Sequence, residues 1–260
     1  MNQFVEKTAE ILNLDLSDPL LAPRGFDMGE DDDNGEPCVL IMGLNPAGNE
    51  SDADREANLS KTYFYGIPGV NLGKEWMHNQ YFVPILKFVN DIMNGNAKWP
   101  WCKKPWQKIE QELNATPHQI NAVRKFYNEN CGSIYTIYIG DMFYYHETKS
   151  KKLPLNEGKN GPNYHKYCME MLEAHINAIR KNIKDREISF IYINNAKVSH
   201  WLCNGDASKT SFIIQGVRVF LGGMLSGQRS MDTFSTNRLK GEIRQALEAE
   251  KNKPQLSTVK

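Results

Sequence analysis

The sequence has few cysteines and no excess of either charge. Its five cysteines are scattered, odd in number and free of any C-x-x-C pair. That pattern argues against disulfides, zinc and iron–sulfur clusters, so we expect reduced thiols, no metal and a cytoplasmic protein. Lysine plus arginine total 31, as do aspartate plus glutamate. Any site for a polyanion must therefore be a local patch.

Long apolar runs are also missing. No stretch reaches membrane-spanning length, and the N-terminus lacks the basic and then apolar segments of a signal peptide. The glycine-rich phosphate loops of common nucleotide-binding enzymes do not occur, nor does the H-x-E and P-C-x-x-C pair of zinc deaminases. These absences argue against a membrane protein, against those two enzyme classes and against a bound cofactor.

What the sequence does contain is an alternation of apolar runs and amphipathic segments. The strands it predicts are 38–42, 134–139, 188–193 and 217–221, with 212–214 as a hairpin arm before the last of them. The helices it predicts are 3–13, 76–93, 117–128, 164–184, 195–203 and 239–251. No repeat or linker divides the chain, so we expect one α/β domain over residues 1–253 and a disordered tail at 254–260.

The most informative segment is the apolar run 38–42 with the turn that follows it, Gly43-Leu44-Asn45-Pro46-Ala47-Gly48. A short apolar run before such a turn is typical of a buried strand. Open α/β sheets bind their ligands at the carboxyl ends of the strands, so Asn45 is a candidate functional residue. Gly, Asn and Pro also serve strand-to-helix turns for backbone reasons alone, and that interpretation stays open.

Four features in order resemble the uracil-DNA glycosylase superfamily, in the branch whose first motif is Gly-x-Asn-Pro, which holds mismatch-specific thymine/uracil glycosylases. They are Gly43–Pro46, the aromatic-Pro-Gly loop at 65–69, the helix-strand-helix segment 164–202, and Met224-Leu225-Ser226-Gly227. The resemblance covers about residues 36–247. It implies a three-layer α/β/α sandwich around a four-stranded, mainly parallel sheet.

The resemblance also implies a reaction and the residues that perform it. A monofunctional DNA glycosylase flips a base out of the stack and hydrolyses its N-glycosidic bond, leaving an abasic site. By resemblance, Asn45 positions the attacking water and Tyr65 stacks on the base. Leu44, Asp141 and Phe143 complete the base-binding set.

Asp141 departs from the family, in which many relatives carry Thr-Asn at this place. A carboxylate only accepts hydrogen bonds, and carboxylates pair with the exocyclic amine of cytosine. We therefore expect a modified cytosine as the excised base, since release of ordinary cytosine would be lethal. A bulky modified cytosine of the kind that bacteriophage DNA carries is one candidate, and it would imply a role in antiviral defence. An Asp at this place can also be a turn or helix-capping residue.

The second motif lacks the His and Pro that many relatives have. Ser226, Gly227 and Ser230 can bind a phosphate, and Arg229 can fill the space left by the flipped base. A basic track for the DNA backbone is expected after the second long strand. It consists of Lys149, Lys151 and Lys152.

Two alternatives remain at this stage. One is a uracil or mismatched-thymine glycosylase of base-excision repair. The other is a catalytically inactive family member that only binds nucleic acid or a partner protein. For either glycosylase, and for a family member that only binds nucleic acid, we expect a monomer that binds DNA without a small-molecule cofactor.

Overall fold

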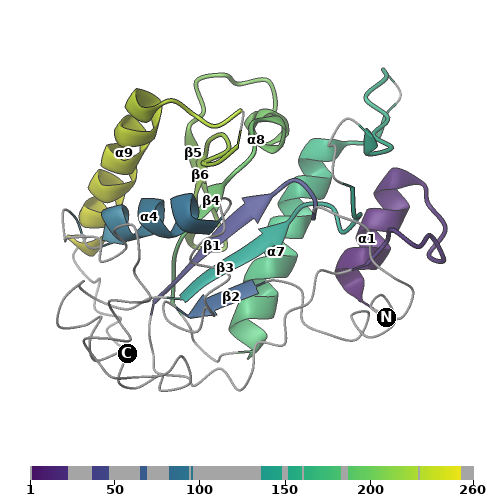
Figure 1. The fold of residues 1–260 in the computed structure, drawn as a ribbon, viewed down its shortest axis with the longest axis horizontal. Helices are drawn as coiled ribbons and strands as arrows, with labels where there is room; N and C mark the ends of the chain where they lie inside the picture. Colours follow the sequence, from purple (N-terminus) through teal and green to yellow (C-terminus); the bar gives the residue numbers. More distant parts are fainter. Residues whose placement is uncertain are drawn as a thin grey trace, which may run out of the picture. The chain divides into compact units, whose positions relative to one another are not determined.

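The computed structural model describes residues 2–22, 37–46, 65–68, 82–93, 95, 136–147, 152–159, 161–182, 187–227 and 229–252 (Figure 1). The chain divides into two compact units, residues 1–69 with 134–223, and residues 70–133 with 224–260. The single domain expected over 1–253 stays a prediction. The expected tail at 254–260, the helix at 117–128 and the residues 76–81 lie outside the described residues.

The first unit holds a sheet and three of the described helices. Its helices are α1 (Gln3–Leu12), α7 (Tyr164–Asn182) and α8 (Ala196–Cys203). Its strands are β1 (Cys38–Gly43), β2 (Tyr65–Pro68), β3 (Thr136–Asp141), β4 (Ile188–Ile193), β5 (Ser211–Ile214) and β6 (Val217–Leu221). The fold is therefore α/β, as the sequence predicts.

The sheet is six-stranded, with the order β2-β3-β1-β4-β6-β5. The four central strands run parallel, whereas β2 and β5 are antiparallel to their neighbours at the two edges. The prediction of a four-stranded sheet is thus wrong in number, although a mainly parallel sheet is confirmed. Parallel strands need long crossover connections, which the chain provides from β1 to β3, from β3 across β1 to β4, and from β4 to β6.

Both extra strands come from segments expected to lie outside the main sheet. Residues 65–68, expected as a loop, pair with β3, and Pro68 is tolerated because β2 is an edge strand. The hairpin between β5 and β6 turns through Gln215 and Gly216, whose φ angles are 47° and 79°. Two positive φ angles in a two-residue loop match the twist of the flanking strands, so this hairpin extends the sheet.

Strand β1 is buried along its whole length, on both faces of the sheet. Cys38, Leu40 and Met42 belong to one apolar cluster with residues of α1 and α7, whereas Val39 and Ile41 point to the opposite face and are fully buried there. A strand covered on both faces has an uninterrupted apolar sequence, which explains why the run 38–42 shows no alternation.

The helices of the first unit are anchored at their starts. Asn195 caps α8 by accepting hydrogen bonds from the backbone N–H groups of Lys197 and Val198. The rings of Tyr164, at the start of α7, and Trp201, in α8, stack with centroids 4.7 Å apart. Figure 1 shows α1 beside α7, and the hydroxyl of Tyr167 in α7 lies 3.1 Å from Thr8 Oγ1 in α1.

The second unit contains α4 (Phe82–Met93) and α9 (Thr233–Lys251). Helix α9 begins six residues earlier than the sequence predicts. Its first turn is stabilised by Asp232, whose carboxylate accepts hydrogen bonds from the backbone and side chain of Ser235. The two helices are joined by an ion pair of 2.6 Å between Lys240 and Asp91.

His175 is a fully buried titratable residue of α7. Its Nδ1 donates to the carbonyl of Met171 at 2.7 Å, so Nε2 of the neutral ring accepts from the hydroxyl of Tyr144 at 2.9 Å. Burial lowers the pKa of His175 to about 4, although the hydrogen bond to Met171 acts in the opposite direction and raises the pKa. The ring is therefore neutral in the folded protein at pH values where it is charged in the unfolded chain.

Acid is expected to destabilise the fold through His175. Well above pH 6.5 the ring is neutral in both states. As the pH falls from 6.5 toward 4 the unfolded chain binds a proton that the folded protein does not. The loss approaches roughly 3 kcal/mol, at about 1.4 kcal/mol per pKa unit. Urea unfolding at steps between pH 7.5 and 4 measures it.

His175→Gln is the comparison for this measurement, because glutamine retains a donor and an acceptor but does not titrate. The variant should be less stable than the wild type at pH 7.5. Its stability should nevertheless fall less steeply between pH 6.5 and 4. Equal slopes for both proteins would contradict the assignment.

Candidate functional site

The carboxyl ends of β1 and β3 lie next to each other in the parallel sheet. Gly43 and Asp141 are direct neighbours in the strand register. A Cβ atom at position 43 would overlap Oδ1 of Asp141, so the carboxylate occupies the space that only a glycine leaves open. The structure thus brings together the first motif and Asp141, which are almost one hundred residues apart in sequence.

Beyond the strands, the two loops run side by side and are joined by backbone hydrogen bonds. The N–H of Met142 donates to the carbonyl of Gly43 at 3.1 Å, and the N–H of Phe143 donates to that of Leu44 at 2.9 Å. Further on, the N–H of Glu147 donates to the carbonyl of Pro46 at 3.1 Å. The turn after β1 is therefore held firmly against the segment after β3.

Asn45 adds a side-chain connection between the same two loops. Its Nδ2 donates to the carbonyl oxygens of Glu147 at 2.8 Å, Tyr145 at 3.2 Å and Pro46 at 3.0 Å. These acceptors use both amide hydrogens, and within the described part of the chain no donor pairs with Oδ1. The residue is half-buried. The carboxamide is thus fixed in orientation, with one acceptor oxygen left to bind a ligand or water.

Leu44 and Phe143, expected in the base-binding set, lie in the core. Leu44 is buried, and the fully buried Phe143 ring packs against Tyr167 with a centroid distance of 5.0 Å and against Trp201 at 5.9 Å. The Phe143 side chain has no exposed surface, so its assignment is corrected from base contact to packing beneath the site. Leu44 keeps a small exposed fraction of 6%, and its contact with a base stays a prediction.

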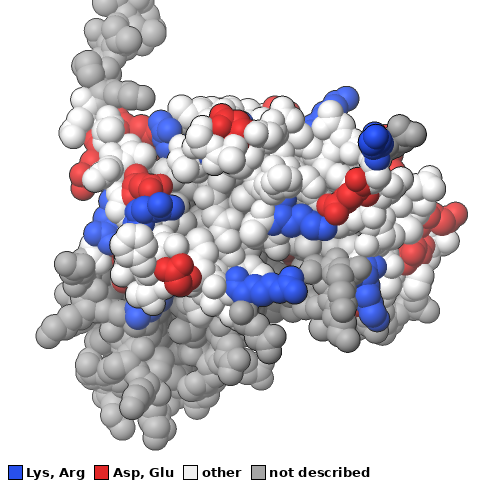
Figure 2. Space-filling view, turned by 90° about the horizontal axis from the view of Figure 1, so that it is seen from above, with Lys and Arg blue, Asp and Glu red and all other residues white. Residues whose placement is uncertain are grey.

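The other predicted residues of the first unit are described only in part. The backbone of Tyr65 pairs with Ile139 in the sheet, but its side chain is outside the description. Lys149 and Lys151 lie outside the described residues, and Lys152 is exposed. Figure 2 presents one face of the molecule, and over its described part lysine and arginine side chains are scattered among acidic ones. The predicted basic track and the stacking role of Tyr65 stay predictions.

The second-motif loop belongs to the second unit. The N–H of Met231 donates to the carbonyl of Met224 at 2.8 Å, which closes the loop, and Gly227 has a φ of +88°. Ser226 is buried, whereas Gly227, Arg229 and Ser230 are exposed. The N–H of Ser230 donates within the loop, to the carbonyl of Gly227 at 3.2 Å, so Ser230 would bind a phosphate through its hydroxyl.

Several residues at the carboxyl edge were missed by the sequence analysis. Asn194, directly after β4, is a buried polar residue whose N–H donates to the carbonyl of Met42 at 2.8 Å. Ser199 accepts from the N–H of Gly222 and donates to its carbonyl, which anchors the end of β6 to α8. The sequence did contain a signal for these residues. Two polar residues, Asn194 and Asn195, directly follow a predicted buried strand and so lie at the carboxyl edge of the sheet.

Replacing Gly43 by alanine is expected to destabilise the protein. The new methyl group would displace the Asp141 carboxylate or the strand end, at a cost of roughly 1 to 3 kcal/mol. Gly241→Ala in α9 is the matched control, because no atom outside the helix's own nearby backbone lies within 4 Å of its added Cβ and alanine favours a helix. Urea unfolding of both variants measures the difference. Equal stabilities would contradict the close packing of Gly43 against Asp141.

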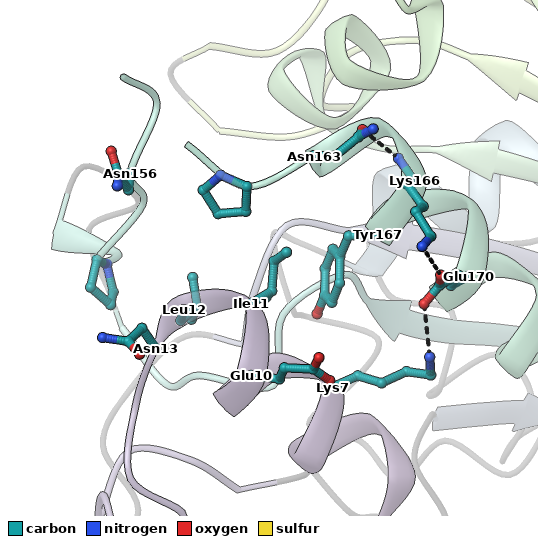
Figure 3. Close-up of a pocket in the computed structure, with 12 residues that line it drawn as sticks. Lys7, Glu10, Ile11, Leu12, Asn13, Asn156, Asn163, Lys166, Tyr167 and Glu170 are labelled. Atoms are coloured by element: carbon teal, nitrogen blue, oxygen red, sulfur yellow. Dashed lines mark hydrogen bonds and ion pairs between the residues drawn. The ribbon is translucent and has the colours of Figure 1, made fainter. Parts of the chain in front are cut away.

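A pocket of about 570 Å³ lies elsewhere in the first unit, between α1, the start of α7 and the loop before it (Figure 3). None of the predicted site residues lines it. Over the described residues, no group of three or more His, Cys, Asp or Glu is arranged to hold a metal ion. The same residues contain no helix that is long and apolar enough to cross a membrane.

No protein-family model matches this chain, and a search of curated proteins gives no match either.

Proposed function

We propose that this protein is a monofunctional DNA glycosylase that hydrolyses the N-glycosidic bond of a flipped pyrimidine, with a preference for a modified cytosine. One observation carries the proposal, which is that Asn45 follows β1 and Asp141 ends the neighbouring parallel strand β3, at the carboxyl edge of the sheet. Ligands of open α/β sheets bind at this edge. The parallel core order β3-β1-β4-β6 is compatible with the four-stranded core that the resemblance implies.

Asn45 would orient the attacking water. Its two N–H groups donate to carbonyls of the neighbouring loop, so Oδ1 is available to accept a hydrogen bond from water. Water attacks C1′ of the sugar, the C1′–N bond breaks, and the electron pair of that bond leaves with the base. The water proton passes to solvent or to the departing base anion. Because the sugar has oxocarbenium character in the transition state, orientation of the water matters more than its deprotonation.

Asp141 would select the base. Its carboxylate is half-buried beside Gly43 and can accept a hydrogen bond from the exocyclic amine of a cytosine. A uracil presents a carbonyl at the same place, which a carboxylate repels. This contrast supports a cytosine-type base over uracil or mismatched thymine. We propose a modified cytosine because release of ordinary cytosine would be lethal, and such a substrate would suit a role in defence against foreign DNA.

The test is incubation of the purified protein with DNA that carries modified cytosine, uracil opposite guanine or thymine opposite guanine, in single- and double-stranded form. Alkali-labile abasic sites should form with modified cytosine. Abasic sites that form only with uracil or thymine would favour the repair enzyme. DNA binding without abasic sites on any substrate would favour the inactive, binding-only protein, and the altered second motif is the feature that supports this rival.

A further inference from the structure

The pocket between α1 and α7 is separate from the Asn45 loop, but one residue connects them. The ring of Tyr167 lines the pocket, and its hydroxyl donates to the carbonyl of Met142 at 2.7 Å. Met142 in turn donates to the carbonyl of Gly43. The volume of about 570 Å³ is within the range of small-ligand sites. The pocket is therefore linked to the turn after β1 through two hydrogen bonds, and it is large enough for a ligand.

Hydrogen-bond donors dominate the polar lining. Three asparagines, Asn13, Asn156 and Asn163, line the pocket. Oδ1 of Asn156 accepts from the N–H of Gly158, and Oδ1 of Asn163 accepts from the N–H of Lys166. Within the described part of the chain, no acceptor pairs with Nδ2 of the three asparagines. These amide groups can thus donate to a ligand that is rich in acceptor oxygens.

The charged residues of the lining differ in the ion pairs that they form. Glu170 pairs with Lys7 at 2.9 Å and with Lys166 at 3.8 Å, so one carboxylate is shared by two ammonium groups. The side chain of Lys166 is 74% exposed, and its long ion pair leaves its other hydrogens available. Glu10 has no ion pair with any described residue. The lining thus offers a cation for an anionic group and one carboxylate for a ligand donor.

The remaining lining is apolar. Figure 3 shows Ile11 and Leu12 of α1 on one side, and two proline rings, Pro154 and Pro162, belong to the same pocket. Flat apolar surfaces of this kind pack against the face of a planar ring. Two further lysines of the same loop, Lys152 and Lys159, are exposed but do not line the pocket.

We propose that this pocket binds a nucleotide, either free or as one unit of a DNA strand. Its phosphate accepts hydrogen bonds from Lys166 and the asparagine amides, and its base lies against the proline rings. Glu10 accepts a hydrogen bond from a sugar hydroxyl or an exocyclic amine. The ligand combines an anion, a flat apolar face and a few donors, which is what this lining complements.

The test measures binding and not base release, so its outcome is independent of the glycosylase proposal. The full chain is titrated with dCMP, deoxycytidine, inorganic phosphate and an eight-nucleotide single strand. Binding is monitored through the side-chain amide NMR signals of its asparagines. The signals of Asn13, Asn156 and Asn163 should shift with dCMP. Deoxycytidine and phosphate alone should bind at least tenfold more weakly, because each makes only part of the contacts.

Two variants remove pocket donors without removing a buried group. Lys166→Ala deletes an exposed ammonium, and Asn13→Gly deletes a carboxamide at a position whose φ of 54° suits glycine. Each should weaken nucleotide binding by about tenfold, the loss of about one charged or two neutral hydrogen bonds. Lys181→Ala, an exposed lysine in the last turn of the same helix, is the matched control and should bind like the wild type.

The oligonucleotide separates the two sources of the ligand. If the pocket variants weaken the strand and dCMP alike, the pocket holds a unit of a DNA strand; if only dCMP is affected, it holds a free nucleotide. No shift of the three asparagine signals with dCMP or the strand would overturn the proposal. Equal losses in Lys166→Ala and Lys181→Ala would also overturn it, because they would indicate attraction by overall charge. Shifts with an extended peptide but with no nucleotide would assign the pocket to a protein partner instead.

Discussion

Asn45→Ala is expected to slow base release by about a hundredfold to a thousandfold, the usual effect of removing one group that stabilises or orients the reacting atoms. The variant loses Oδ1, the acceptor for the attacking water, and also the three hydrogen bonds to the neighbouring carbonyls. Single-turnover rates at saturating DNA measure the chemical step. The dissociation constant for DNA should change much less than the rate.

The control must separate water positioning from loop stability. Asn2→Ala removes a carboxamide that caps α1 through Phe4 N–H, so it also lowers stability through a lost hydrogen bond, by about 1 kcal/mol. It should leave the rate unchanged. Asn45→Asp keeps an acceptor oxygen but faces three carbonyls with a carboxylate, so it should destabilise the loop more than alanine does. Base release by Asn45→Ala at the wild-type rate would remove the basis of the glycosylase proposal.

Asp141→Asn is expected to change which base is released. Asparagine has almost the same size, so it fits beside Gly43, and its amide can both donate to a carbonyl and accept from an imino group. One well-placed pair distinguishes bases by about 1 to 3 kcal/mol, so the ratio of uracil to modified-cytosine excision should rise by roughly 5- to 150-fold. Competition between the two substrates in one reaction measures the ratio directly.

Asp141→Ala completes this comparison. It removes the acceptor without adding a donor, so excision of modified cytosine should fall while excision of uracil does not rise. An unchanged ratio in Asp141→Asn would show that the carboxylate serves the turn after β3 and does not read the base.

Much of the fold could be predicted because it depends on local patterns. The apolar run at 38–42 and the amphipathic segment at 164–184 correspond to β1 and α7. The Gln215-Gly216 turn is confirmed as well, since turn chemistry acts between residues that are adjacent in sequence. The start of α9 was missed because Asp232 and Ser235 form a cap in a segment with little apolar periodicity.

The candidate site could be predicted less well. The resemblance implied that Phe143 contacts the base, but its ring turns into the core and packs with Tyr164, Tyr167 and Trp201. Which way a side chain turns after the last strand residue depends on partners from other elements. The number of strands was also wrong, because pairing at a sheet edge depends on which backbone remains unpaired there.

The sequence alone determined the class of fold, the buried central strand and the sharp turn with Asn45 at its end. These follow from apolar burial and from the backbone preferences of Gly, Asn and Pro, which act locally. Only the tertiary structure decided that Asp141 fills the space beside Gly43 and that the Asn45 amide donates to Tyr145 and Glu147. It also decided that α1 and α7 leave a pocket between them. Those contacts join residues about one hundred or more positions apart, and no local pattern specifies such partners.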